Sequence, residues 1–488
     1  MPADRHTYRE RHRPQVHYSP RQHWVNDPNG LVFVAGTFHL FYQHNPLGPT
    51  PGNLSWGHAT STDLLHWTEH PVALPARETH VIYSGSAVVD THNTSGLGTA
   101  DQPPLVALYT GHTDVHPQRT HLDKRHHEAQ YLAFSPDQGR TWTYGGETAV
   151  LDLNKPDFRD PKVFRDEARG RWVMAVVHPD ERQVEFYASA DLQVWQTLST
   201  FGPAGEVTGI WEVPEFFPLM DEAGVERWVL KVDFNPGGLH GGSGAQYWVG
   251  DFDGTTFTPL TPSRTLDYGK DFYAGLSWSD LPARRVWLAW MNNWEYATVL
   301  PTSPWRGAFT VPRELSLGAA WHLVQRPVPE VQALRRDVTR FECEPLLAAR
   351  TFPLRAGEAH EFTLAAHLPD EAALRVEFVS AEGVEVSVQV SRAALQVTRP
   401  AHPEVPGFGG THSAPLPDGP AMTEFTLLLD TSSLEVFAAG GQVVLTELLL
   451  PAAPVQAVRF QPVTGRPGVT GSFCEWRSIW ERADATRR

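Results

Sequence analysis

Three motifs of this sequence place a carboxylate residue one or two positions before a proline and next to other polar or aromatic residues. The carboxylates are Asp27 in Asn26-Asp27-Pro28, Asp160 in Arg159-Asp160-Pro161, and Glu212 in Trp211-Glu212-Val213-Pro214. Proline lacks a backbone donor, fixes its own φ and favours extended geometry in the residue before it. Local covalent structure therefore helps to aim these side chains. Taken singly, each motif is also an ordinary turn or cap, because Asn, Asp and Pro are common turn residues.

Two carboxyl groups on opposite sides of an anomeric carbon can cleave a glycosidic bond with retention of configuration. They must lie roughly 5 Å apart, one as nucleophile and the other as acid and then base. The nucleophile must stay ionised, which suits Asp27 beside a hydrogen-bond donor such as Asn26. The acid must hold a proton near neutral pH, which suits Glu212 between the apolar side chains of Trp211 and Val213.

The third carboxylate has a charged neighbour. Arg159 precedes Asp160, and its positive charge is expected to keep Asp160 ionised. A carboxylate that never takes the proton can bind sugar hydroxyls tightly. If the fold brings Asp27, Asp160 and Glu212 together, the three predict a glycoside hydrolase.

Five apolar, strand-like runs recur along the first two thirds of the chain. They begin at Phe38, Leu105, Trp172, Trp228 and Val286, at intervals of 67, 67, 56 and 58 residues. An Asp-centred turn closed by an aromatic residue follows each of the first four runs: Asp63 with Trp67, Asp137 with Trp142, Asp191 with Trp195, and Asp253 with Phe257. A repeat of about 60 residues made of strands and turns is typical of a four-stranded propeller blade. The spacing predicts a five-bladed β-propeller over residues 17–325, with a large β-sandwich of accidental spacing as the alternative.

A short segment of unusual chemistry precedes each apolar run by a comparable distance. The segments are Asn26-Asp27-Pro28, Tyr83-Ser84-Gly85-Ser86, Arg159-Asp160-Pro161, Trp211-Glu212-Val213-Pro214 and Asp271-Phe272-Tyr273. If each begins the innermost strand of its blade, the five segments converge at the propeller axis. Residues far apart in sequence would then line one pocket.

The segments outside the propeller are expected to differ in structure. Residues 1–16 have the composition of a loose polar arm. A helical linker is predicted over 326–340, with Pro at its start and apolar residues at helical spacing: Pro329, Val331, Leu334 and Val338. Alternating apolar runs over 341–488, interrupted by a Pro- and Gly-rich loop at 401–420, predict a β-sandwich. The predicted fold class is all-β, a five-bladed β-propeller followed by a C-terminal β-sandwich.

Composition agrees with such a fold and excludes some functions. The 488 residues include 41 Pro, 39 Gly, 17 Trp and 24 Phe, which favours many short strands joined by tight turns. A net charge of −16 argues against binding to nucleic acid, which requires clustered Lys and Arg. Cys343 and Cys474 are too few for a disulfide framework, and the sequence leaves open whether they pair.

No signal-type apolar run occupies the N-terminal residues, and no run of about 18 apolar residues occurs elsewhere. A soluble cytoplasmic protein without a membrane contact is the default expectation. Five histidines, His112, His116, His121, His126 and His127, lie close in sequence. They lack the compact spacing of a metal site, so a solvated loop is the preferred interpretation and no metal is expected.

These motifs resemble those of the retaining β-fructosidases of glycoside hydrolase family 32, which includes invertases, levanases and exo-inulinases. The resemblance runs from about Tyr18 through Leu317 and continues more weakly beyond. It implies that Asp27 is the nucleophile, Glu212 the acid/base and Asp160 a transition-state stabiliser that holds fructose hydroxyls. It also implies a five-bladed propeller followed by a β-sandwich, and no cofactor.

The resemblance extends to residues around the fructosyl unit. The substrate contacts that it implies are Asn26, Gln43, Trp56, Tyr83, Ser84, Arg159, Tyr273 and Trp294. Near Pro51, where the family commonly has a pocket-wall Trp, this chain has only Trp56 five residues later. Val213 replaces the Cys that usually follows the acid/base, which leaves the pH optimum open.

The resemblance therefore implies an exo-acting β-fructosidase that hydrolyses terminal β-D-fructofuranosyl residues of sucrose and of inulin- or levan-type fructans by double displacement. Two alternatives stay open: a fructosyltransferase that uses the same site, and a fructan-binding propeller without catalysis. The expected partner is a sucrose or fructan substrate. The sequence ranks neither the substrates nor the oligomeric states.

Overall fold

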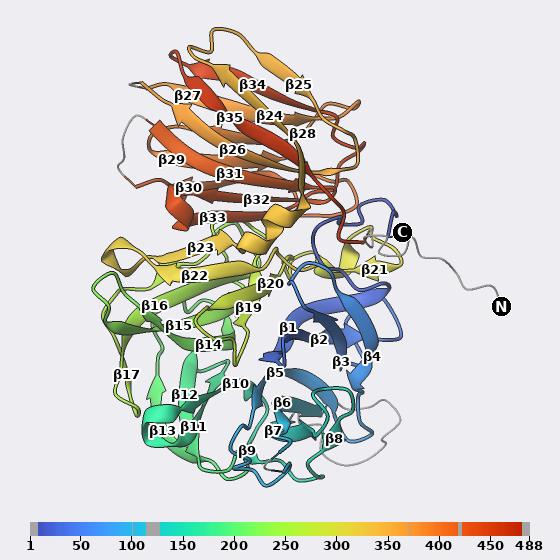
Figure 1. The fold of residues 1–488 in the computed structure, drawn as a ribbon, viewed down its shortest axis with the longest axis vertical. Helices are drawn as coiled ribbons and strands as arrows, with labels where there is room; N and C mark the ends of the chain where they lie inside the picture. The colour runs from blue at the N-terminus through green and yellow to red at the C-terminus, as the bar shows by residue number, and fades with distance from the viewer. Residues whose placement is uncertain (1–7, 100, 114–126, 370, 418–421, 481–488) are drawn as a thin grey trace, which may run out of the picture.

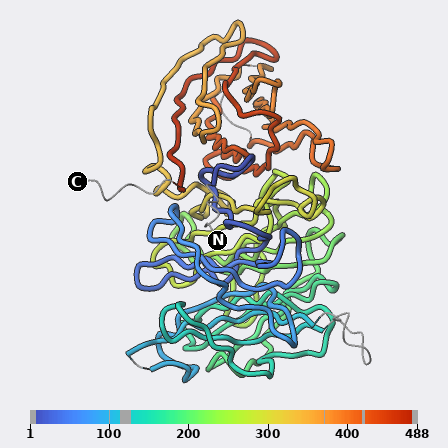
Figure 2. The backbone as a smooth tube through the Cα atoms, turned by 90° about the vertical axis from the view of Figure 1, so that its right-hand side faces the viewer, coloured from blue at the N-terminus to red at the C-terminus, as the bar shows by residue number. Residues whose placement is uncertain are grey.

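The computed structural model of the protein describes residues 8–99, 101–113, 127–369, 371–417 and 422–480. Two domains are stacked along the long axis of the molecule (Figures 1 and 2). Five sheets surround a central axis in the first domain, and two six-stranded sheets form the second. This architecture confirms the prediction of a five-bladed β-propeller followed by a β-sandwich.

Each blade is an antiparallel sheet whose main strands follow one another outward from the axis. Blade I contains β1 (His23–Val34), β2 (Thr37–Asn45), β3 (Ser55–Ser61) and β4 (Thr68–Leu74). Blade II contains β5 (Val81–Val89), β6 (Leu105–Thr113), β7 (His127–Ser135) and β8 (Thr143–Tyr144), with β9 (Leu151–Lys155) beside β7. Blade III contains β10 (Arg159–Asp166), β11 (Arg171–His178), β12 (Gln183–Ser189) and β13 (Gln196–Phe201). Blade IV contains β14 (Ile210–Met220), β15 (Glu226–Asn235), β16 (Gly244–Phe252) and β17 (Phe257–Pro259), with β18 (Arg264–Thr265) beside β16. Blade V contains β19 (Tyr273–Ser277), β20 (Val286–Trp290), β22 (Arg313–Leu317) and β23 (Leu323–Pro327).

The five apolar runs form the second strands β2, β6, β11, β15 and β20. They are buried on both faces because a neighbouring blade packs on each side. Between blades I and II, for example, Phe41 and Trp56 pack in one cluster with Tyr109. Comparable clusters fill the other four gaps between blades, so the ring is held together by apolar contacts all the way round. A further strand, β21 (Trp305–Arg306), runs parallel to β1 and extends blade I.

The predicted Asp-centred turns connect the third and fourth strands of blades I to IV. Asp191 Oδ1 accepts hydrogen bonds from the backbone N–H groups of Gln193 and Val194, each at 2.9 Å. Asp63 and Asp253 accept from the residues two and three positions on in the same way. Such turns satisfy backbone donors that would otherwise lack a partner, which explains why Asp recurs at this place in these four blades.

The sandwich consists of two sheets with the apolar core between them. The first contains β24 (Arg335–Cys343), β35 (Gly468–Trp476), β26 (Ala359–His367), β31 (Met422–Asp430), β32 (Ser433–Ala438) and β33 (Val443–Leu448). The second contains β25 (Arg350–Pro353), β34 (Ala457–Thr464), β27 (Ala373–Val379), β28 (Val384–Val390), β29 (Ala394–Arg399) and β30 (Gly410–Pro415). Cys343 and Cys474 are both free thiols.

Three predicted segments differ from the structure. The linker over 326–340 is helical only in the 3-10 helix η4 (Pro329–Leu334), because β24 then pairs with β35 and overrides the helical spacing. The loop over 401–420 contains the edge strand β30, which pairs with β29. In the predicted arm, residues 1–7 lie outside the described residues, whereas Arg13 is 1% exposed and donates to Ser19 Oγ at 2.9 Å.

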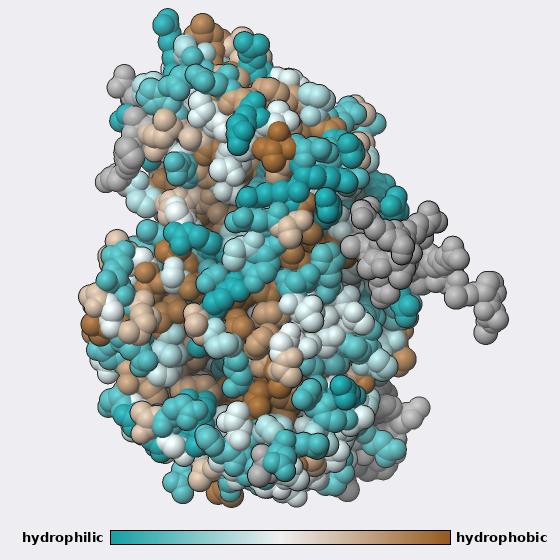
Figure 3. Space-filling model, viewed as in Figure 1, coloured by the Kyte–Doolittle hydropathy of each residue, from teal (hydrophilic) through white to brown (hydrophobic). Residues whose placement is uncertain are grey.

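Hydrophilic residues cover much of both domains on the face shown in Figure 3, with hydrophobic residues scattered among them. No helix in the described part of the chain has the length and apolar character needed to cross a lipid bilayer.

N-terminal residues lie between the two domains (Figure 2), and His17 joins them. Its Nδ1 lies 2.8 Å from Asp430 Oδ2 and its Nε2 lies 2.7 Å from Glu435 Oε1, with all three side chains at 0% exposure. Glu435 also accepts hydrogen bonds from Arg313 of β22. Burial disfavours the charged imidazole, but the hydrogen bonds to Asp430 and Glu435 outweigh it and raise the pKa of His17 to about 9. A charged histidine thus links propeller and sandwich.

The charge on His17 predicts that the free energy of unfolding decreases at alkaline pH. A rise in pKa from 6.5 to about 9 corresponds to on the order of 3 kcal/mol of stability. The contribution is complete below pH 6.5 and is lost as the pH rises through about 9. We expect the thermal unfolding midpoint to drop across this interval, and the drop to shrink in His17→Gln. The exposed pair of His66 with Asp63 offers a matched control, His66→Gln, which should retain the full drop. An unchanged alkaline drop in His17→Gln would contradict the assignment.

Candidate active site

The innermost strand of every blade carries a β-bulge near its start. Two residues of the inner strand oppose one residue of the second strand: Asn26-Asp27 opposite Gln43, Tyr83-Ser84 opposite Thr110, Asp160-Pro161 opposite Val176, Val213-Pro214 opposite Val232, and Ala274-Gly275 opposite Ala289. Figure 1 shows these strands, β1, β5, β10, β14 and β19, around the centre of the propeller. A bulge bends the strand and re-aims a side chain. The five predicted segments therefore converge at the axis.

Three of the bulges contain a non-glycine residue in the left-handed region. Asp160 has φ 64°, Val213 φ 45° and Ala274 φ 54°. A β-branched residue such as Val213 rarely adopts this conformation. Backbone strain of this kind costs about 1–3 kcal/mol and persists where the surrounding structure imposes it, which is common at functional sites.

Asp27 is held at both carboxylate oxygens. Ser84 Oγ donates to Oδ2 at 2.5 Å, and Asn26 Nδ2 donates to Oδ1 at 3.0 Å. Asn26 is fixed in turn, because Trp24 Nε1 donates to its Oδ1 at 2.7 Å. Burial raises the pKa of Asp27 to about 6; Glu212 adds to the rise, and the bonds from Ser84 and Asn26 oppose it. The carboxyl group is thus rigidly oriented and mostly ionised at neutral pH.

Glu212 is held by two donors and still reaches solvent, with 20% of its side chain exposed. The Tyr273 hydroxyl donates to Oε2 at 2.5 Å, and Arg159 Nη1 donates to Oε1 at 3.2 Å. Arg159 is anchored in turn by Glu128 and Asp157. An accessible carboxyl group in a fixed orientation can exchange a proton with a ligand.

Asp160 lies between the other two carboxylates in chain order and is 5% exposed. Its Oδ2 accepts a hydrogen bond from the backbone N–H of Val213 at 2.8 Å, and its own N–H donates to Thr110 Oγ1 at 2.9 Å. The first of these bonds joins Asp160 directly to the residue after Glu212.

Arg159 acts on Asp160 in the predicted direction, but burial outweighs its effect. Burial raises the pKa of Asp160 well above its usual range; Arg159 offsets part of this rise, and Glu212 and Asp27 add to it. The physical reason is that the Arg159 guanidinium turns to Glu128, Asp157 and Glu212. Adjacency in sequence does not give contact at a bulge, because successive side chains point in different directions.

Three of the other predicted site residues lie around this group. Gln43 opposes the bulge at Asp27 and is 1% exposed. Tyr83 is partly exposed, and its ring stacks on His112 with centroids 4.4 Å apart. Trp294 is also partly exposed, with its ring 6.0 Å from that of Trp24. Tyr83 and Trp294 therefore keep ring surface available beside the carboxylates.

Trp56 does not fit the prediction of a substrate contact. It is 0% exposed and packs in the apolar cluster between blades I and II. Its Nε1 donates to the carbonyl oxygen of Tyr83 at 2.9 Å. Trp56 thus supports the Tyr83 bulge from behind, because β3 turns its ring into the core.

The histidine segment lies only partly within the described residues, since His116, His121 and His126 fall outside them. His112 is a buried residue of β6 with Nδ1 2.9 Å from Glu128 Oε1, which differs from the predicted solvated loop. His127 pairs with Asp152 at 2.9 Å. His112 therefore belongs to the support of Arg159 through Glu128.

Sequence reasoning missed a second layer behind the carboxylates. Glu128 anchors Arg159, and Thr110 receives the Asp160 N–H. Lys231 and Asp233 form a buried ion pair in β15, across from Glu212. The sequence does indicate this pair, because two charged residues stand within or directly after the apolar run that begins at Trp228.

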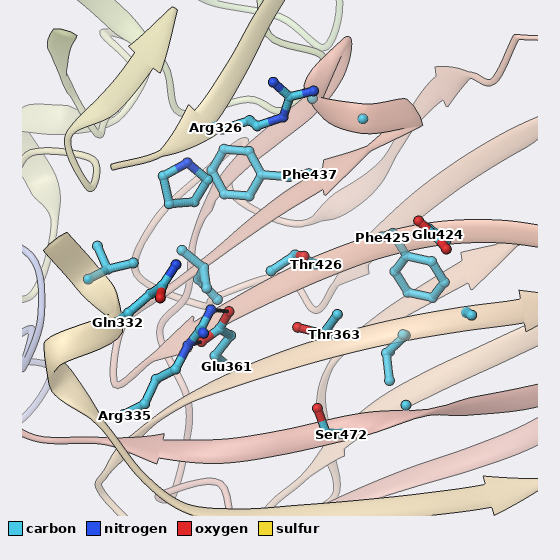
Figure 4. Close-up of a pocket in the computed structure, with 18 of the residues that line it drawn as sticks. Arg326, Gln332, Arg335, Glu361, Thr363, Glu424, Phe425, Thr426, Phe437 and Ser472 are labelled. Carbon is cyan, nitrogen blue, oxygen red and sulfur yellow. Dashed lines mark hydrogen bonds and ion pairs between the residues drawn. The ribbon is translucent and has the colours of Figure 1, made fainter. Parts of the chain in front are cut away.

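A cavity of about 620 Å³ lies between the domains, and most of its lining residues belong to β23, η4, β24, β26, β31 and β35. Figure 4 shows Arg335 and Glu361 paired there, with Arg335 Nη2 donating to Glu361 Oε1 at 2.6 Å. None of the predicted site residues lines this cavity. It is separate from the carboxylates at the propeller axis.

Comparison with known proteins assigns both domains. The profile described as "Glycosyl hydrolases family 32 N-terminal domain" matches residues 17–327, and that described as "Glycosyl hydrolases family 32 C terminal" matches residues 330–473. A levanase from Bacillus subtilis is 40% identical over 472 residues, which cover 92% of this chain and 68% of the levanase.

Solved structures agree with this assignment. The crystal structure of an exo-inulinase from Aspergillus awamori superposes with a TM-score of 0.90 at 32% identity, covering 97% of this chain and 100% of that chain. A fructofuranosidase variant from Schwanniomyces occidentalis in complex with fructosylnystose gives a TM-score of 0.87 at 28% identity, covering 96% and 98%. The chain therefore belongs to glycosyl hydrolase family 32 and is a β-fructosidase.

Proposed function

We propose that this β-fructosidase removes terminal β-D-fructofuranosyl units from sucrose and fructans by double displacement with retention. The observation that carries the proposal is the pairing of two unlike carboxyl groups at one axis. Asp27 is buried and held by Ser84 and Asn26, whereas Glu212 is accessible and held by Tyr273. This asymmetry is what a nucleophile and an acid/base require.

In the proposed first step, Glu212 protonates the glycosidic oxygen and Asp27 attacks the anomeric carbon. The bond to the leaving group breaks, and a fructosyl ester of Asp27 forms. In the second step Glu212, now ionised, takes a proton from water, which attacks the same carbon and releases fructose and the free carboxylate. Asp160 is proposed to hold fructose hydroxyls throughout.

The relatives support fructans as substrates beside sucrose. The similar levanase and exo-inulinase are named for fructan-degrading activities, and the similar fructofuranosidase was solved with fructosylnystose. Partly exposed rings at Tyr83 and Trp294 suit the apolar faces of a sugar.

Loss of the nucleophile should abolish turnover. We expect Asp27→Asn to lower kcat by at least about 10³-fold, because an amide cannot form the ester. Thermal unfolding should show that the variant is folded. Trp287→Phe serves as a control at a buried residue of blade V, and it should retain most activity. Near-normal turnover in folded Asp27→Asn would refute the proposal.

The pH–rate profile should separate the two carboxyl groups. Because Asp27 must be ionised to attack, kcat/KM should fall as the pH drops below about 6. Glu212 must be protonated, so its removal in Glu212→Ala should lower kcat by about 10²–10⁴-fold and flatten the alkaline limb. A retained alkaline limb in Glu212→Ala would show that another group is the acid.

The products distinguish hydrolysis from transfer and rank the substrates. We expect free fructose from sucrose, inulin and levan when the three are compared at equal mass, and an initial product of retained configuration by NMR. Chains that lengthen at high sucrose would indicate a fructosyltransferase instead. Absence of free fructose from all three would indicate a binding protein.

A further inference from the structure

Lys231 and Asp233 form an ion pair in the interior of blade IV. Lys231 Nζ contacts Asp233 Oδ2, and both side chains are 0% exposed. Their neighbours in β15, Val229, Leu230 and Val232, belong to the apolar core. Desolvation of two charges is costly, and apolar residues of similar volume usually fill such a place at least as well. The packing of the core therefore does not explain the pair.

The pair brackets the bulge that carries the acid/base. In the ladder of β14 and β15, Asp233 is the partner of Glu212 and Lys231 is the partner of Glu215, with the bulge Val213–Pro214 between them. Directly opposite residues on one face lie close enough to interact. Asp233 thus places a further carboxyl group beside Glu212, and Lys231 supplies the compensating cation.

Lys231 also holds the strained backbone of the bulge. Its Nζ donates to the carbonyl oxygen of Val213 at 3.1 Å. The backbone N–H of Val213, whose φ is 45°, donates to Asp160 Oδ2 at 2.8 Å. One peptide segment therefore connects the buried cation with both Glu212 and Asp160, and its position depends on the lysine.

The charges that face the pair come from several strands. Burial raises the pKa of Asp233 to about 7; Lys231 lowers it, and Asp27 of β1 and Glu212 of β14 raise it. The charge of Asp233 contributes to the raised pKa of Tyr273 in β19, and the charge of Lys231 contributes to the lowered pKa of Lys162 in β10. Lys231 in turn lowers the pKa of Asp27. One oxygen of Asp233, Oδ1, is buried without a hydrogen-bond partner among the described residues, which is unfavourable for a purely structural carboxylate.

We propose that Lys231 and Asp233 are positioning residues for the reaction: Lys231 holds the Val213 bulge that aims Glu212 and Asp160, and Asp233, opposite Glu212 in the ladder, keeps that cation in place. The proposal deepens the proposed function, since it rests on the roles proposed for Asp27, Asp160 and Glu212. Neither residue touches the substrate in this role.

The test is the acid limb of kcat/KM for sucrose in three variants. Lys231→Gln removes the cation, so the limb should move to higher pH by about half a unit or more. Asp233→Asn removes the part of the negative charge that Asp233 still carries near pH 6, so it should move the limb to lower pH by a smaller amount. The double variant Lys231→Gln/Asp233→Asn should bring the limb back toward the wild-type position. A general loss of stability lowers activity, but it does not move the acid limb to higher pH in one variant and to lower pH in the other.

Asp280→Asn is the matched control. Burial also raises the pKa of Asp280 to about 6, but its Oδ2 accepts from the backbone N–H of Val89 at 2.8 Å, at the far end of β5 from Ser84. This variant should leave the limb in place. Lys231→Gln should in addition lower kcat several-fold with little change in KM, because the bulge aims groups that act in the transition state.

Each outcome decides the proposal. An acid limb that stays in place in folded Asp233→Asn, or moves in the same direction in both single variants, would overturn it. If Lys231→Gln does not fold, Asp233→Asn and the double variant still carry the test. Activity in Asp27→Asn would instead refute the proposed function, so the two failures are distinguishable.

Discussion

A mismatch of two residues against one, repeated in all five inner strands, is the constraint on which the site depends. The extra residue cannot join the ladder, so its side chain turns toward the axis. The three carboxylates occupy different positions relative to the β-bulge. Asp27 is the second bulged residue, Asp160 the first, and Glu212 the residue just before. One backbone feature thus supplies three acids whose directions differ, and the apolar packing between blades offsets the strain.

The sandwich contributes to the rigidity of this arrangement. Arg399 of β29 donates to Asp271 and, at 2.7 Å, to the hydroxyl of Tyr296. Asp271 stands two residues before Tyr273, whose hydroxyl donates to Glu212. His17 and Arg313 join the same two domains through Glu435. The second domain therefore fixes the start of blade V, and through it one of the two donors to Glu212.

Periodic features of the sequence predicted the fold, because the same physical task recurs in each blade. The apolar runs mark the second strands, and Asp63, Asp191 and Asp253 mark turns whose backbone donors need an acceptor. The convergence of Asp27, Asp160 and Glu212 was predicted from their comparable distance to these runs. Contacts that depend on the direction of one side chain could not be predicted. Arg159 forms its ion pairs with Glu128, Asp157 and Glu212, and the ring of Trp56 enters the core.

Pairing between strands accounts for the other differences. Val338 shows helical spacing but lies in β24, because pairing with β35 decides its conformation. The relation of Lys231 and Asp233 to Glu212 appears only when the register of β14 and β15 is known. A sequence shows that two charges stand in an apolar strand, and only the ladder shows which carboxylate they face.

The strand β21 determines when blade I can be completed during synthesis of the chain. It pairs with β1 although the two stand at opposite ends of the propeller sequence, and the partners of His17 come later still. During synthesis Asp27 leaves the ribosome early, whereas the strand that completes its blade leaves after most of the ring. A nascent chain therefore holds no finished site until nearly the whole propeller has emerged.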